Sequence, residues 1–486
     1  MNWQLIIIII YFAATVLIGL HSAKKTKSAK AFTGAELSIF AIVCASTGEW
    51  LGGTATTGVA EYGFNYGMTG AWYTIANGIG VLFLGLCFAK LFRSLETGTV
   101  PGIIEKFFGV KARSVSCIVL TIVMLAIGLS QMIAAGKLGQ NLMGIDFNIA
   151  CILFAVIFII YTLAGGMNAV ASTNVLHLFV MYFGVILAVI LTVSKVGGMN
   201  EFFSGMTMVE ENLASQGQQV SFLNMFTIGG SKVSSWIIAS LLGACTAQAG
   251  LQPVLAAKNA SQAKIACLIT ALVAAPFGFF TAFLGICARI LSEKGELLNM
   301  AGEVVSNGKD ALPSLMMNMT PIAGGLILAA ILAAVLSTVS PIILAAGTML
   351  TRDIYQRVLR PEASDDDVLK MSRITTAISG VICCIGAIAL VNASAVLDIV
   401  YAAYSLRGAC FVIVLLGIYW KKSSENGACY SMIFTAVVSV IWVVIKMITG
   451  SYPIASWFSE TYAAVVVAFV SCIIFSILSP DKEKTN

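Results

Sequence analysis

The sequence has little charge and almost no histidine. Of its 486 residues, only 10% are charged and two are histidine, whereas 59% are hydrophobic. The mean hydropathy is +0.94. A soluble domain carries about 25% charged residues, so most of the surroundings of this chain are expected to be lipid. The net charge of +5 is spread over many loops, which argues against a nucleic-acid partner.

The sequence also lacks the spacings that indicate metal sites or disulfide frameworks. It has twelve cysteines, but nearly all lie inside apolar runs and none forms a CxxC pair, so they are expected to be small packing residues. His21 and His177 are too far apart in sequence to suggest a ligand cluster. The first apolar run has no basic residues before it, and lysines follow it, which predicts a retained span rather than a signal peptide.

Long apolar runs dominate the remainder of the chain. A helix needs about 20 apolar residues to cross a bilayer, and about thirteen runs meet that length. Their approximate limits are 3–20, 38–62, 69–92, 114–142, 147–167, 172–196, 233–256, 264–291, 321–349, 373–392, 395–420, 427–448 and 460–479. The expected fold is therefore an all-α polytopic membrane protein.

The basic residues gather on alternate connections between these runs. The connections rich in lysine and arginine begin with Lys24, Lys25, Lys27 and Lys30, and they end with Lys482 and Lys484. Because basic loops stay in the cytoplasm, the N-terminus is expected outside and the C-terminus in the cytoplasm, in a cell membrane. The two longest connections, 197–232 and 292–320, then lie outside and are expected to form partly structured caps.

Two spans that lie five spans apart are both interrupted near the middle. The interrupting residues are Gly48, Gly52, Gly53 and Gly58 in span 38–62, and Gly243, Gly250 and Pro253 in span 233–256. Paired broken helices in inverted repeats mark the midplane binding site of many transporters. The alternative is that the glycines only allow close helix packing.

This pattern predicts one transport domain over residues 1–486. Its parts would be a leading span over 3–20, a first repeat over 38–196, an inverted second repeat over 233–420 and two further spans over 427–479.

The span 321–349 carries neighbouring hydroxyls at mid-membrane depth. Ser337 and Thr338 stand in an apolar helix, and Pro341 follows three residues later. Oxygen ligands beside a weakened helix suit a small hard cation. The alternative is that both hydroxyls bond to carbonyls one turn earlier, near Ala333 and Ala334.

Five motifs then stand in order along the chain. They are Gly48-Glu-Trp-Leu-Gly-Gly-Thr to Phe64-Asn-Tyr-Gly67, Tyr161-Thr-Leu-Ala-Gly165-Gly166, Gln252-Pro-Val-Leu-Ala256-Ala257-Lys258, Ala333-Ala334-Val-Leu-Ser337-Thr338 with Asp353-Ile354-Tyr355, and Lys421-Lys422 to Gly427-Ala428. Together they resemble the sodium:solute symporter family from about residue 38 to 440. The resemblance implies a leucine-transporter-type core of two inverted five-helix repeats with flanking helices.

The resemblance also implies a sodium site between spans 38–62 and 321–349. Its ligands would be Gly48, Leu51 and Ala334 through backbone carbonyls, with the hydroxyls of Ser337 and Thr338. A register shifted to Ala45 and Gly48 fits span 38–62 as well. Many family members have Asp where this chain has Asn174, and the serine that accompanies it at a second sodium site is replaced by Ala334. About one sodium per cycle is therefore implied.

A small-molecule substrate would sit against the break in span 38–62. The candidate residues are Trp50, Gly52, Gly53, Thr54, Trp72, Gln131, Gln248 and Arg407. Arg407 is a charge inside a span, and a guanidinium can hold a carboxylate with two hydrogen bonds. Alternatively, Arg407 pairs with Glu49 or Asp398.

These observations predict a sodium-coupled symporter of a small organic solute, with carboxylates or amino acids favoured. The open alternative is a proton-coupled or uncoupled carrier of the same fold. A channel would need a continuous polar stripe or charged ring, and an intramembrane enzyme would need a base near Ser337. The sequence shows neither feature. Oligomeric state is left open.

Overall fold

The computed structural model describes residues 3–24, 26–299, 302–391 and 396–481, and nearly all of them are helical. The helices are α1 (Trp3–Ala23), α2 (Ala29–Thr33), α3 (Ile39–Trp50), η1 (Thr54–Gly58), α4 (Val59–Tyr66), η2 (Gly67–Ala71), α5 (Trp72–Phe83), η3 (Leu84–Phe88), α6 (Ala89–Ser94), α7 (Val100–Phe108), α8 (Val110–Met143), α9 (Phe147–Val196), α10 (Met199–Ser215), α11 (Gly230–Gly243), η4 (Ala244–Thr246), α12 (Gln248–Leu255), α13 (Ala260–Ala274), α14 (Phe277–Glu293), α15 (Gly308–Met317), α16 (Pro321–Met349), η5 (Leu350–Leu359), α17 (Asp365–Leu390), α18 (Val396–Tyr419), α19 (Glu425–Thr449) and α20 (Glu460–Leu478).

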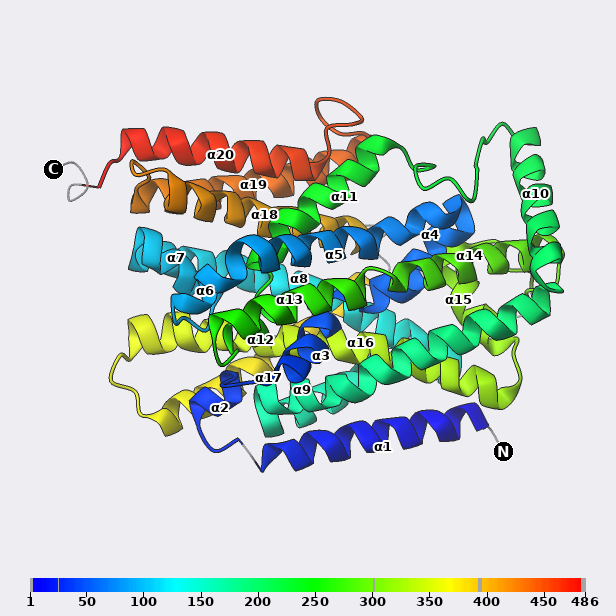
Figure 1. The fold of residues 1–486 in the computed structure, drawn as a ribbon, viewed down its shortest axis with the longest axis horizontal. Helices are drawn as coiled ribbons and strands as arrows, with labels where there is room; N and C mark the ends of the chain where they lie inside the picture. Colours follow the sequence, from blue (N-terminus) through cyan, green and yellow to red (C-terminus); the bar gives the residue numbers. More distant parts are fainter. Residues whose placement is uncertain (1–2, 25, 300–301, 392–395, 482–486) are drawn as a thin grey trace.

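Most of the long helices run along one common direction (Figure 1). Helix α1 lies at one edge of the bundle and α20 at the opposite edge, and α10 crosses one end. Helices α2, α6 and α7 lie at the other end, which we call the basic end because the loops rich in lysine and arginine lie there. The first described residues and the last ones lie at opposite ends of the bundle, as an odd number of spans requires.

The fold class predicted from the sequence is confirmed, because the described residues form an all-helical membrane-type bundle. Nine helical stretches in the described part of the chain are long and apolar enough to cross a membrane, or ten if the bent α11–α12 pair counts as one span. One of these stretches, Phe147–Val196, contains two of the expected spans. The number thirteen and the boundaries of the two repeats therefore stay predictions.

Helix α16 forms the centre of the bundle. Nearly every residue from Gly324 to Met349 is buried, although lipid-facing helices such as α1 and α17 expose apolar side chains. Pro341 lies inside this helix and does not end it. Since proline has no N–H group to donate, it leaves the carbonyl of Ser337, four residues earlier, free for another partner.

Both spans that the sequence marks as interrupted are broken. In the first, α3 ends at Trp50, and Leu51 leaves the helical region with φ −109° and ψ 43°. In the second, α11 and α12 meet at an angle of 45°, with Ala247 at φ −73° and ψ 88°. Gly250 and Pro253 lie inside α12 and not at this break. Gly250 instead permits contact with the first broken span, because a Cβ there would lie 3.0 Å from the ring of Trp50.

A glycine bend joins the two expected spans 147–167 and 172–196 without a loop. Gly166, inside α9, has φ 53° and ψ −135°, a conformation that residues with a side chain rarely adopt. A Cβ at Gly166 would lie 2.3 Å from the carbonyl oxygen of Phe32. The tight turn therefore depends on the absence of a side chain.

We predict that Gly166→Ala lowers the free energy of unfolding by about 1–3 kcal/mol, the usual cost of holding a residue with a side chain in such a conformation. Thermal unfolding in detergent measures the change. Gly230→Ala is the control, because a Cβ at Gly230 meets nothing within 4 Å. Equal stability of the two variants would contradict the conclusion that the turn at Gly166 depends on the absence of a side chain.

Candidate functional site

The break in the first span faces the middle of α16. Gly52 directly follows the break, and a Cβ on it would lie 2.6 Å from the hydroxyl oxygen of Thr338. The backbone N–H of Gly53 donates to the side-chain oxygen of Gln131 on α8, at 2.7 Å. A side chain thus satisfies a donor that the interruption frees, and glycine lets α16 approach the exposed backbone.

Four of the five predicted sodium ligands meet at this place. The Thr338 hydroxyl donates across the helix boundary to the carbonyl oxygen of Gly48, at 2.6 Å, and it also lies 3.2 Å from the carbonyl oxygen of Ala334. The Ser337 hydroxyl donates to the same Ala334 oxygen at 2.8 Å. Leu51 is buried and precedes Gly52. Two carbonyl and two hydroxyl oxygens therefore share one small, buried volume.

The sequence left two interpretations of Ser337 and Thr338, a cation site or hydroxyls that bond back to their own helix. The contacts agree with parts of both. The bond from Ser337 to the Ala334 carbonyl is the back-bond of an ordinary apolar helix. The bond from Thr338 to Gly48 is different, because it joins α16 to the broken span. For a cation to bind here, both hydroxyls would rotate so that their oxygen lone pairs face the ion. The carbonyl oxygens would then coordinate the ion instead of accepting the hydroxyl protons. Neutral oxygen donors of this kind suit a monovalent hard cation.

Asn174 on α9 lies beside the same carbonyl groups. Its side-chain nitrogen is 3.4 Å from the carbonyl oxygen of Ala45 and 3.3 Å from that of Ser337. The Ser337 oxygen is available because Pro341 has no N–H group to donate to it. The uncharged amide of Asn174 thus directs its N–H groups at these two carbonyl oxygens, which could otherwise bind a cation.

The charged candidate of the last core span is paired. Arg407 on α18 bonds to the Glu49 carboxylate on α3, with 3.0 Å between Nη1 and Oε1, and both side chains are 1% exposed. Its guanidinium lies 5.4 Å from the Trp50 ring centroid and 4.7 Å from that of Tyr404. Of the two ion-pair partners that the sequence suggested for Arg407, the structure shows Glu49. The side chain of the other, Asp398, lies outside the described residues.

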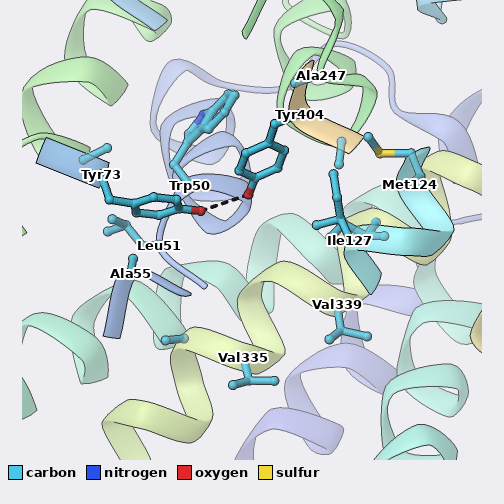
Figure 2. Packing of buried hydrophobic residues seen from close by; sticks show 14 of the residues in the cluster. Trp50, Leu51, Ala55, Tyr73, Met124, Ile127, Ala247, Val335, Val339 and Tyr404 are labelled. Atoms are coloured by element: carbon cyan, nitrogen blue, oxygen red, sulfur yellow. Dashed lines mark hydrogen bonds between the residues drawn. The ribbon is translucent and has the colours of Figure 1, made fainter. Parts of the chain in front are cut away.

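Two tyrosines that sequence reasoning did not single out complete this cluster. The hydroxyls of Tyr73 and Tyr404 are 2.9 Å apart and lie beside Trp50 (Figure 2). Tyr404 precedes Arg407 by three residues on one helix, a spacing that places both on one face and could have drawn attention to it. Nothing in the sequence near Tyr73 marks it.

The other predicted substrate residues separate into two groups. Gln131 and Thr54 lie together, with 3.4 Å between the Gln131 nitrogen and the Thr54 hydroxyl. Trp72 instead donates its indole N–H to the carbonyl of Met225, at 2.9 Å, in the loop near α10. Gln248 lies toward the basic end, where its side chain bonds to the loop before α7. The structure therefore brings Trp50, Gly52, Gly53, Thr54, Gln131 and Arg407 to the break and places Trp72 and Gln248 away from it.

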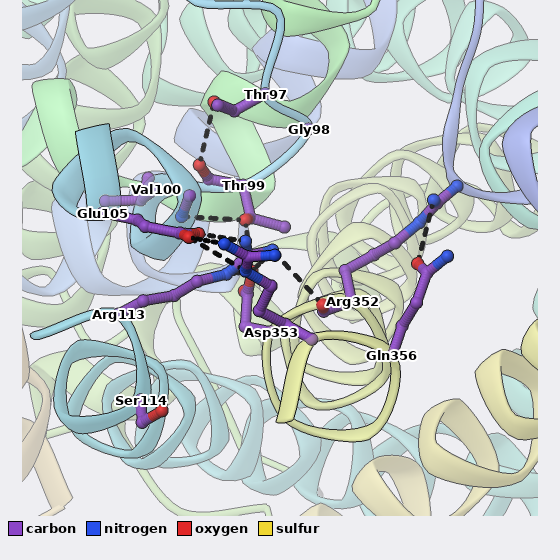
Figure 3. Close-up of polar contacts among 12 residues, drawn as sticks. Thr97, Gly98, Thr99, Val100, Glu105, Arg113, Ser114, Arg352, Asp353 and Gln356 are labelled. Atoms are coloured by element: carbon purple, nitrogen blue, oxygen red, sulfur yellow. Dashed lines mark hydrogen bonds and ion pairs between the residues drawn. The ribbon is translucent and has the colours of Figure 1, made fainter. Parts of the chain in front are cut away.

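A charged cluster secures the chain at the basic end (Figure 3). The buried carboxylate of Asp353 in η5 accepts from the Thr99 hydroxyl and from Arg113, at 2.8 Å each. Glu105 on α7 pairs with Arg113 and with Arg357. Burial alone would raise the pKa of Glu105, but the hydrogen bonds from the two arginines outweigh it and hold that pKa below its usual range. Helix α7 is thereby fixed to the end of α16.

Beside this cluster lies a polar cavity of about 1020 Å³. Its lining includes Lys30, Arg93 and Lys258, together with Gln252 and Thr348. Among the described residues that line it, none is a predicted sodium ligand or one of the residues at the break. We call this cavity the vestibule.

Solved structures with the same arrangement of helices define the class of protein. The chain is similar to a Na⁺-coupled sialic acid symporter in a substrate-bound outward-open state, with a TM-score of 0.81, 20% identity, and coverage of 99% of this chain and 98% of the other. It is also similar to MhsT in complex with L-phenylalanine, with a TM-score of 0.58, 14% identity, and coverage of 90% and 99%. The protein has the leucine-transporter-type fold.

The family follows from the sequence. Residues 32–435 match the sodium:solute symporter family, and the chain belongs to it. It is 22% identical over 491 residues to a sodium/glucose cotransporter of Vibrio parahaemolyticus, covering 96% of this chain and 90% of the relative. It is 23% identical over 490 residues to the osmoregulated proline transporter OpuE of Bacillus subtilis (strain 168), covering 98% and 95%. The chain is therefore a multi-pass membrane carrier and not an enzyme, as the sequence predicted.

We predict that Glu49→Gln or Arg407→Gln alone destabilises the protein by about 3–5 kcal/mol, because each leaves a buried charge without its partner. The double variant should recover most of the loss. A double-mutant cycle of unfolding in detergent measures this coupling.

The half-exposed pair of Arg289 and Glu293, 2.7 Å apart on α14, is the matched control. Glu293→Gln should cost less than about 1 kcal/mol. Similar losses at the buried and the half-exposed pair would contradict the prediction.

Proposed function

We propose that this protein is a sodium-coupled symporter that imports a small organic solute by alternating access. The bond from the Thr338 hydroxyl to the Gly48 carbonyl carries the proposal, because it joins two of the predicted sodium ligands, one on α16 and one on the broken span. The sodium ligands would be Gly48, Leu51, Ala334, Ser337 and Thr338. The N-terminus lies outside and the basic end faces the cytoplasm, so that the vestibule is the inner exit.

Sodium between α16 and the broken span would hold these two elements together and favour the outward-facing state. Coupling between two ligands is typically about 1–3 kcal/mol, enough to raise solute affinity severalfold. Each charge that moves inward gains about 2.3 kcal/mol per 100 mV of membrane potential. The membrane potential and the sodium gradient would together drive uptake.

The solute is expected to be an amino acid or a carboxylate, bound between the break and the cluster around Arg407. The pair of Glu49 and Arg407 has no net charge. Among the described residues, the second oxygen of Glu49 and the Nε of Arg407 are buried and have no hydrogen-bond partner. A zwitterion offers a carboxylate to Arg407 and an ammonium group to Glu49. A simple carboxylate would instead separate Arg407 from a buried Glu49 carboxylate, which is costly. Amino acids are therefore the preferred class.

About one sodium ion per cycle is expected. Asn174 stands where a carboxylate would help to hold a second ion, and its amide nitrogen is directed toward the carbonyl of Ser337. The alternative, proton coupling, has its own supporting observation. His177, one turn further along α9, is buried, with Nδ1 2.5 Å from the Tyr11 hydroxyl, and its Nε2 has no partner in the part of the chain that the structure describes.

The test is uptake into proteoliposomes across a panel of amino acids, carboxylates and sugars, under a sodium gradient or a proton gradient. We predict that Ser337→Ala with Thr338→Ala weakens the apparent sodium affinity at least tenfold, about 1.4 kcal/mol. Thr338→Ser should retain most of it.

Ser340→Ala is the control, because the Ser340 hydroxyl bonds to Tyr161 and Leu336 rather than to the predicted ligands. Uptake that follows protons and ignores sodium would support the alternative. Unchanged sodium dependence in the double variant would overturn the ion site.

We further predict that Asn174→Asp makes the dependence of uptake on sodium steeper, with the Hill coefficient rising from about 1 toward 2, the limit that two sites set. The carboxylate would remove two N–H donors from the neighbouring carbonyls and add a negative charge. Asn148→Asp, at the start of α9 and exposed, is the control. An unchanged Hill coefficient would argue that the residue has no influence on stoichiometry.

A further inference from the structure

The vestibule ends at the same level on two helices. Along α16 and η5, its lining begins at Thr348 and continues through Arg352 and Gln356. Along α12, it begins at Gln252 and continues through Leu255. Thr348 is ten residues beyond Thr338, which is about 15 Å at 1.5 Å per helical residue. Something between these levels therefore separates the vestibule from the ion site.

Two glutamines of α12 lie at this limit, Gln252 in the lining of the vestibule and Gln248 one turn before it, next to the bend at Ala247. Gln248 and Gln252 are four residues apart, on one face of the helix, with 3.3 Å between the Gln248 nitrogen and the Gln252 oxygen. The nitrogen of Gln252 donates to the Thr348 hydroxyl at 3.1 Å and to the carbonyl of Thr33 at 2.7 Å. Both glutamines are at most 2% exposed.

The other end of this chain of bonds holds the loop before α7. The oxygen of Gln248 accepts from the backbone N–H of Val100 at 2.7 Å, and its nitrogen donates to the carbonyl of Gly98 at 3.2 Å. We call Gln248, Gln252 and these partner groups the glutamine bridge. It joins the inner half of the broken span α11–α12 to the end of α2, to α16 and to the α7 loop.

The two sides of the bridge differ in strength. The α7 loop is fixed to η5 through the charge-assisted bond from Thr99 to Asp353, a carboxylate that Arg113 on α8 also holds. Such bonds are roughly twice as strong as neutral ones. The bonds of the glutamines are neutral amide and hydroxyl bonds. An element that must open in every cycle is better held by neutral bonds, while the surface that it closes against stays fixed.

From this geometry we propose that the glutamine bridge is the inner gate of the carrier, and that Gln248 and Gln252 are positioning residues that hold α12 closed. The proposal rests on the alternating access proposed above. It gives Gln248 a role in gating rather than in binding the substrate. Opening the bridge would connect the ion site with the vestibule and release sodium and solute to the cytoplasm.

The experiment compares Gln252→Ala with Gln140→Ala, a control at an exposed glutamine on α8. Without the bridge, the inward-open state should be more populated, and the apparent affinity for external sodium falls in proportion to the outward-facing fraction. We expect a fall of about fivefold to tenfold in proteoliposome uptake, together with a sodium leak in the absence of solute. Sodium binding in detergent should weaken in the same direction, because sodium is proposed to favour the outward-facing state.

A pair of substitutions at Thr348 covers the case in which Gln252→Ala fails to fold. Thr348→Val keeps the shape and loses the hydroxyl, so it should move sodium affinity in the same direction by a smaller factor. Thr348→Ser keeps the hydroxyl and should behave as the unmodified protein.

Hydrogen exchange in lipid nanodiscs provides a readout that does not depend on sodium coupling. Residues 248–255 should exchange faster in Gln252→Ala and in Thr348→Val, but not in Gln140→Ala or Thr348→Ser. If exchange rises while uptake ignores sodium, the gate stands and the sodium proposal fails. If exchange and external sodium affinity both stay unchanged, the gate is wrong.

Discussion

The contact between a broken helix and an unbroken one underlies the rest of this structure. Where α3 ends, backbone groups lose their helical partners, and in a membrane such groups must be satisfied by protein. The Gln131 side chain accepts a hydrogen bond from the N–H of Gly53, and the Thr338 hydroxyl donates one to the carbonyl of Gly48. Both helices can approach this closely because glycine stands at Gly48 and Gly52. The proposed ion site depends on this local loss of helical bonding.

Local patterns predicted much of the fold and marked the break at which the ion site is proposed. Apolar runs located the helices, and glycine clusters marked both broken spans, because these signals depend on neighbouring residues. The position of the second break differed: Gly250 serves close packing against Trp50, and the chain bends at Ala247 instead. Whether a glycine bends a helix or lets another helix approach depends on tertiary neighbours, which one sequence does not reveal.

The substrate side was harder to predict for the same reason. Gln131 and Gln248 are both buried glutamines in core helices. Gln131 bonds to the break, whereas Gln248 bonds to a loop at the basic end. Trp72 faces a loop that has no regular pattern. Tyr73 and Tyr404 meet from helices more than 300 residues apart. Such pairs depend on how distant helices rotate against each other, and composition and periodicity carry no record of that rotation.

The vestibule has a consequence for the energy of ion release. Its volume of about 1020 Å³ equals the liquid volume of roughly 30 water molecules, at about 30 Å³ each. That number exceeds what a small cation needs for a first hydration shell. An ion released through the proposed gate would therefore recover its water within the vestibule, and most of the dehydration cost of binding would be reversed there. The last part of the exit would then be ordinary diffusion of a hydrated ion.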